Sequence, residues 1–297
     1  MTTEHAGSGG PDLGAELART LRELLEVLPA MRASAGGWPG AASPAMGELE
    51  AEAGLAGPVP WGAEPVMAAR NLAVALSVAA ADHTAAFADA VERYAPYAPA
   101  VAARAAAEAC GQIAWLCEER IGARDRVRRM VNERLCSFAD ERKVVGRVPA
   151  LAGLLAELDA TVAGLRSCAE SLGYPLNAWY LTPDPPGMGE LVSLLFDPDV
   201  GALMYHLMSS AGHGRVAGLM RSVSSGPTAD GLSAQTGVIH MRPHDAAMQA
   251  SALLICLQEA IRALAAYSGW DDGSWTPRWT AAAAVAETAR RQFATDD

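Results

Sequence analysis

Charged side chains interrupt long apolar helix faces at a few places, and these are the residues that could do chemistry. Arg104, Glu108 and Trp115 share one stripe of a helix expected over residues 99–121. If that helix is central, the arginine has to be paired and fully hydrogen-bonded. The pattern predicts either a structural ion pair between helices or a ligand site. In the ligand site Arg104 clamps an anion, Trp115 contacts the ligand and Glu108 moves a proton.

A second stripe carries Tyr205, Ser209 and His213 at positions i, i+4 and i+8. Gly212 and Gly214 flank the histidine, which indicates a helix break that exposes the imidazole or lets another backbone approach. In an enzyme, His213 would be the acid/base, Tyr205 an orienting donor and Ser209 a ligand contact.

Asp82 and His83 stand in an otherwise apolar helix, where an isolated histidine is most often a hydrogen-bonded core residue. The functional alternative requires His83 and His213 to converge inside the fold. Together with Asp82, Glu108 or Glu133 they would then offer acid/base groups or metal ligands. We predict no specific metal site, and the sequence leaves the cofactor unknown.

Acidic and aromatic residues also crowd one loop near the C-terminus. Asp271 and Asp272 resemble the start of the DDxx(D/E) metal-diphosphate motif of helical isoprenoid cyclases, but Trp275 replaces the last acid. We interpret the two aspartates as turn residues before Gly273 and the tryptophans of this loop as packing residues. Signatures of P-loop nucleotide binding, HExxH zinc proteases and GxSxG hydrolases are absent from the sequence.

The amino-acid composition limits the fold classes and the binding partners that can be expected. Half of the residues are hydrophobic, alanine dominates, and only 6% are aromatic, so the chain is expected to be all-α: a single large helical bundle of about 8–10 helices, with one short hairpin at GVIHM. The net charge of −11 argues against nucleic acid. We interpret the one basic patch, Arg124, Arg126, Arg128 and Arg129, as a solvated helix surface.

The five cysteines form no CxxC pair, and residues 1–12 lack the features of a signal peptide, which together predict a cytoplasmic protein. The longest near-apolar stretch, residues 72–81, is too short to span a bilayer, so no membrane partner is expected. The predicted organisation is a disordered tail (1–10), an N-terminal helix with a Gly/Pro-rich loop (11–63) and a helical bundle domain (64–297). Helices are expected over about 12–28, 65–94, 99–121, 123–145, 149–172, 188–196, 198–211, 213–223, 244–267 and 277–293, and a short one over about 46–53 inside the loop of residues 34–63.

Residues 65–225 resemble a set of uncharacterised actinobacterial all-helical proteins. The shared features are an Asp-His pair, an Arg–Glu helix ending in aromatics, an Arg-rich helix with an "ERL" step, and a Y-x-x-x-S-x-x-x-H-G segment. This chain has Trp115 alone where those proteins have two aromatics. The layout is distantly similar to abortive-infection and HEPN-like helical proteins, and the resemblance implies a helical fold.

Two functions follow as hypotheses. The first is a noncatalytic interaction or sensing protein of the abortive-infection/HEPN-like type, with a homodimer expected through an exposed Ala/Leu helix face. The alternative is an enzyme that binds a small-molecule ligand in a pocket inside the bundle, an isoprenoid-type lyase or cyclase being one version.

Overall fold

The computed structural model describes residues 12–34, 36–52, 64–177, 180–212, 223–225, 237–239, 241 and 243–294. Over these ranges the chain is all-α, as predicted, apart from one two-stranded antiparallel hairpin. The helices are α1 (Leu13–Leu25), α2 (Leu28–Ser34), α3 (Pro44–Ala51), α4 (Pro65–Glu92), α5 (Ala98–Leu116), α6 (Ala123–Val145), the 3₁₀ turn η2 (Pro149–Leu151), α7 (Ala152–Ser171), α8 (Met188–Ser193), α9 (Pro198–Gly212), α11 (Pro243–Ser268) and α12 (Trp275–Ala294). The hairpin pairs β1 (Val223–Ser225) with β2 (Gly237–Ile239).

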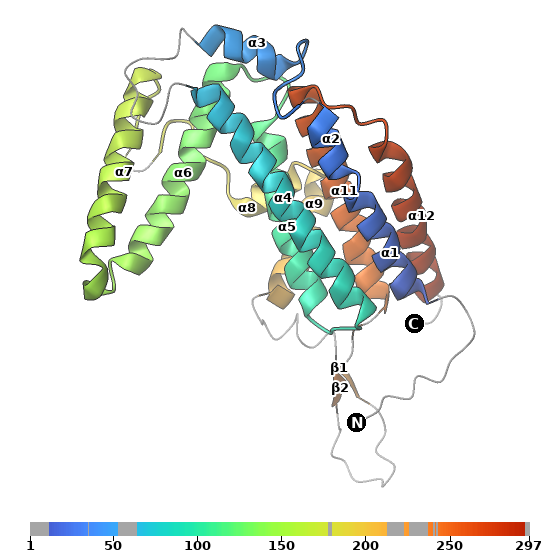
Figure 1. Ribbon diagram of the computed structural model, residues 1–297. Coiled ribbons are helices and arrows are strands. Elements are labelled where there is room, and N and C mark those ends of the chain that lie inside the picture. The colour runs from blue at the N-terminus through green and yellow to red at the C-terminus, as the bar shows by residue number, and fades with distance from the viewer. Residues whose placement is uncertain are drawn as a thin grey trace.

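The body of the molecule is a bundle in which α5 lies at the centre. It packs against α4, α11, α8 and α9, while α1 lies along α4 and α12 (Figure 1). Small side chains make this packing close: Ala103, Ala106 and Ala107 of α5 are fully buried. A Cβ atom on Gly111 would come within 2.9 Å of the Leu191 carbonyl carbon, so α8 approaches the α5 backbone directly. Residues of α1 and α3 belong to the same core cluster as α4, α5 and α11.

The helices α6 and α7 form an arm that leaves the body (Figure 1). In the described residues, α7 packs along α6 and η2 and has at most sparse contact with other elements. The base of the arm is held by the first half of α6. Asn132 is fully buried there; its side chain donates to the Leu181 carbonyl oxygen and accepts from the Leu181 N–H, both at 2.9 Å.

Most helix predictions are confirmed to within a few residues, and two boundaries are wrong. The first predicted helix, expected to reach Leu28, ends at Leu25. A helix that was not predicted, α2, follows it and accommodates Pro29 in its first turn, where a missing N–H costs nothing. The helix predicted to reach Ile121 ends at Leu116. Arginine side chains of α6 satisfy carbonyl oxygens at and beyond this end, at Trp115, Leu116, Glu118 and Ile121.

The helix predicted over 213–223 lies almost wholly outside the described residues. The loop of residues 34–63 contains α3, close to the short helix expected at 46–53. The strand character of GVIHM is confirmed by β2. In the described chain, α4 and α11 are long and apolar enough to cross a membrane by length and composition, with 39% and 61% of their most apolar windows buried in the bundle.

Candidate functional site

The predicted polar stripe of α5 faces α9. The Arg104 Nε donates to Glu108 Oε1 at 2.8 Å, and the Tyr205 hydroxyl donates to the same oxygen at 3.0 Å. The Arg104 guanidinium also lies over the Tyr205 ring, 5.6 Å from its centroid. The three side chains therefore form a polar contact between the two helices.

Partial burial sets the electrostatics of this contact. Burial lowers the pKa of Arg104, and the hydrogen bond and charge of Glu108 more than offset this, so the net shift is upward. Burial and the neighbouring Glu108 carboxylate raise the pKa of Tyr205. The phenol therefore stays protonated and continues to donate, which is the state that a structural contact requires.

A second carboxylate, Glu133 of α6, lies next to Gln112 of α5. The Gln112 amide donates to Glu133 Oε2 at 3.1 Å and also approaches the Met188 sulfur at 3.7 Å. Glu133 has no ion pair within the described residues, and burial raises its pKa to about 7. A carboxyl group with that pKa can accept or release a proton near neutrality.

The other predicted site residues do not join this cluster. Asp82 and His83 are exposed on α4 and make no hydrogen bond or ion pair within the described part of the chain. Trp115 is buried, with the Arg129 guanidinium 5.1 Å from its ring centroid. Ser209 is half-buried on α9. The prediction for His213 lies outside the described residues, and the described residues contain no group of three or more His, Cys, Asp or Glu suited to a metal ion.

The interpretation of the basic patch as a solvated surface is wrong. Arg126 is 2% exposed and Arg128 is 5% exposed, and the Arg129 side chain is 11% exposed. These arginines face the body, where they hold backbone carbonyls and neighbouring acids. The first turns of α6 are thus an internal polar junction, and Arg124, which is exposed, is the exception.

Arg126 is the centre of that junction. Its guanidinium donates to both carboxylate oxygens of Glu48 at 3.0 and 3.1 Å, and to the carbonyl oxygens of Leu116, Glu118 and Ile121. It also stacks on Tyr267, 3.9 Å from the ring centroid. The Tyr267 hydroxyl donates to Glu48 at 2.9 Å. The Arg126 side chain therefore connects α6 to α3, to α11 and to the end of α5, and each of its three nitrogen atoms donates a hydrogen bond.

Burial perturbs the groups around Arg126. It raises the pKa of Tyr267 strongly and raises the pKa of the Cys117 thiol to about 12, so both stay neutral. Arg70, which is 4% exposed, lies close enough to interact electrostatically with both groups. Its Nη1 donates to the Gly37 carbonyl at 3.2 Å, and its buried Nε has no acceptor in the described residues.

A cavity of about 630 Å³ opens beside this junction, between α3, the link from α5 to α6, and the C-terminal half of α11. Buried residues form its floor, and exposed or half-exposed charged residues form its rim. The floor includes Cys117, Arg126, Tyr267 and Trp270, and the rim includes Glu118, Glu119, Glu259, Arg262 and Asp272.

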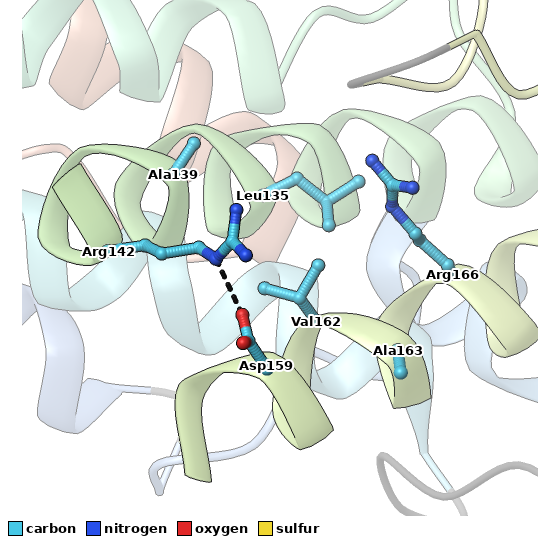
Figure 2. A pocket seen from close by; sticks show the side chains of 7 residues that line it. All are labelled: Leu135, Ala139, Arg142, Asp159, Val162, Ala163 and Arg166. Carbon is cyan, nitrogen blue, oxygen red and sulfur yellow. Dashed lines mark hydrogen bonds and ion pairs between the residues drawn. The ribbon is translucent and has the colours of Figure 1, made fainter. Parts of the chain in front are cut away.

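A second, smaller cavity of about 380 Å³ lies in the arm, between α6 and α7 (Figure 2). Leu135 and Val162 point toward one another from the two helices, and the alanines Ala139 and Ala163 leave the space beside them open. The Arg142 Nε donates to Asp159 at 2.5 Å and bridges the two helices at one end. The two helices of the arm are therefore imperfectly packed against one another.

The aspartates of the C-terminal loop are turn residues, as predicted. The Asp271 side chain accepts from the Gly273 N–H at 3.0 Å. Packing of the tryptophans is confirmed for Trp275, whose indole donates to Gln258 at 2.8 Å, and for Trp279, whose indole donates to the Leu254 carbonyl at 2.8 Å. Trp270 differs because it lines the larger cavity.

Comparison with known proteins gives no family and no relative. No known protein family, no curated protein and no solved structure matches the chain. The resemblance to actinobacterial and abortive-infection/HEPN-like helical proteins therefore stays a prediction, and the function has to be argued from the geometry alone.

Proposed function

We propose that the protein is a noncatalytic interaction or sensing protein that self-associates through the α6–α7 arm. The observation that carries the proposal is the isolation of α7, which has one packed side and leaves the rest of its surface to solvent. The polar residues of the α5 stripe support it, because Arg104 and Tyr205 already use Glu108 as their internal partner.

The tip of the arm exposes aliphatic side chains. Val144 is 66% exposed, and Val148, Leu151 and Leu154 are each about two-fifths exposed. The exposed surface of α7 outside the cavity that it shares with α6 carries small residues, namely Gly153, Ala156, Ala160 and Ser167. Small side chains let a second helix approach closely, and apolar side chains gain free energy when a partner covers them.

A second copy of the chain fits this surface by size. The 20 residues of α7 make a helix about 30 Å long, and two adjacent helices present a face roughly 20 Å wide. That face is about 600 Å² per subunit, close to the roughly 800 Å² per partner of a stable protein interface. Two arms packed together would form an intermolecular four-helix bundle, a common arrangement of helical hairpins.

Sedimentation velocity from about 1 to 100 μM tests the proposal. We expect the wild-type chain to dimerise over this range and the double variant Ala156→Glu/Ala160→Glu to remain monomeric, because two carboxylates would be buried at the seam. Ala284→Glu on α12 is the matched control, since Ala284 is also exposed but lies on the opposite side of the body. A monomeric wild type, or a dimer that tolerates both arm substitutions, contradicts the proposal.

Glu133 supports a second candidate function, a small-molecule enzyme. Burial raises the pKa of its carboxyl group to about 7, and the Gln112 amide of α5 donates to it. A panel of small hydrolysable and eliminable substrates, assayed at pH 6 and pH 8, tests this candidate. Turnover that Glu133→Gln abolishes, while the variant remains folded, would favour the enzyme over the interaction protein.

A further inference from the structure

We propose that the cavity beside Arg126 binds a small organic cation that also carries an oxygen acceptor, as basic amino acids and their amides do. The inference is independent of arm pairing, because the cavity lies between α3, the α5–α6 link and α11. Its volume of about 630 Å³ falls within the range of small-molecule sites.

Charge at the rim selects a cation. Five carboxylates and two guanidinium groups line the cavity. Two of the carboxylates have internal partners, because Glu48 pairs with Arg126 and Glu118 pairs with Arg129. Glu119, Glu259 and Asp272 make no ion pair in the described part of the chain. Arg262 on the rim likewise makes no ion pair there, so three carboxylates stand against one guanidinium and the unpaired rim is negative on balance. A cleft with an excess of one sign of charge concentrates ligands of the opposite sign.

The floor of the cavity includes a side chain whose hydrogen-bond donor has no acceptor in the described residues. Trp270 is 6% exposed and lines the cavity, and its indole Nε1 is buried without an acceptor in the described residues. An indole N–H can only donate, so the partner that satisfies it has to supply an oxygen. A ligand with its cation at the rim and its oxygen toward the floor matches this polarity.

An organic cation fits the rim better than a metal ion. The described residues hold no group of three or more His, Cys, Asp or Glu close enough to share a metal. The rim carboxylates are therefore spread over the mouth of the cavity, as suits an extended cation with ammonium or guanidinium groups at more than one place.

Isothermal titration calorimetry with two probes tests both parts of the inference. L-argininamide carries an ammonium, a guanidinium and an amide oxygen, whereas agmatine carries two cationic groups and no oxygen. We expect L-argininamide to bind more tightly than agmatine, and L-glutamate not to bind. Trp270→Phe should remove the preference for L-argininamide, because the ring stays and the N–H donor is lost.

Charge variants locate the site. Glu259→Gln and Asp272→Asn should each weaken L-argininamide binding about threefold, the size of one exposed ion pair, and Arg262→Gln should strengthen it by a similar factor. Glu50→Gln is the matched control, since Glu50 is exposed on α3 outside the cavity. The inference is overturned if L-argininamide does not bind, or if the Glu259→Gln/Asp272→Asn double variant binds it as tightly as the wild type does. Neither result depends on the dimer, which sedimentation measures separately.

Discussion

Replacing Arg126 by methionine tests whether the polar junction holds the fold together. The substitution keeps a long apolar side chain and removes the guanidinium donors to Glu48 and to the carbonyls of Leu116, Glu118 and Ile121. Within the described residues, Glu48 then keeps only the hydrogen bond from the neutral Tyr267 hydroxyl. The Glu48 side chain is only 13% exposed, so it would be left as a nearly buried, unpaired charge. Breaking a buried pair in this way costs about 3–5 kcal/mol. For a domain of this size that lowers the Tm by roughly 8 °C.

Equilibrium urea unfolding followed by far-UV circular dichroism measures the effect. Arg120→Met is the matched control, because Arg120 is exposed in the same link, and it should change the free energy of unfolding by less than about 0.5 kcal/mol. The double variant Arg126→Met/Glu48→Leu should be more stable than the sum of the two single losses by about 1–3 kcal/mol, because it leaves no unpaired charge. A loss below about 1 kcal/mol for Arg126→Met, or strict additivity in the double variant, would refute the reasoning.

Two further predictions concern the polar groups of α6. Burial raises the pKa of Glu133 to about 7, so the folded state binds a proton more tightly than the unfolded state. The free energy of unfolding should therefore fall by up to about 3 kcal/mol as the pH rises from about 4.5 to 7, and it should stay low above pH 7. Glu133→Gln should match the wild type near pH 4 and exceed its stability at pH 8 in urea unfolding, and identical pH profiles would rule the burial penalty out. Asn132→Ala should cost about 2–4 kcal/mol, because the buried N–H and C=O of Leu181 each lose their partner. Differential scanning calorimetry measures that loss, and an unchanged Tm would mean that Asn132 does not hold the base of the arm.

Much of the helical framework was predictable because its signals are local. Pro65 and the apolar repeat after it predict the start of α4, and Gly122 marks the start of α6. The two polar stripes that contain Arg104, Glu108 and Tyr205 were also accessible, since each has a helical period and buried polar groups need partners. The pairing of the two stripes, about a hundred residues apart, had to come from the fold.

The Arg126 junction could not be read from the sequence. Alternating arginines and acids around residues 118–133 have the pattern of a solvated helix, and local spacing gives no sign of burial. The partner Glu48 is 78 positions away, and the hydrogen bond from Tyr267 to Glu48 spans 219 positions. The early end of α5, where carbonyls without helical partners require donors from elsewhere, was also hidden, because the sequence predicted a helix as far as Ile121.

Helix α6 connects the two proposed sites. Its first turns hold Arg126 at the cavity, and its last turns form the arm, so one helix of 23 residues, about 35 Å long, spans both. A helix with an intact hydrogen-bond ladder moves as a rigid rod, so its direction at the arm is set by its anchors at the junction. Those anchors are Arg126 on Glu48 and Asn132 on Leu181, and both are buried. If both proposals hold, a ligand that fills the cavity would act on the helix that sets the direction of the arm.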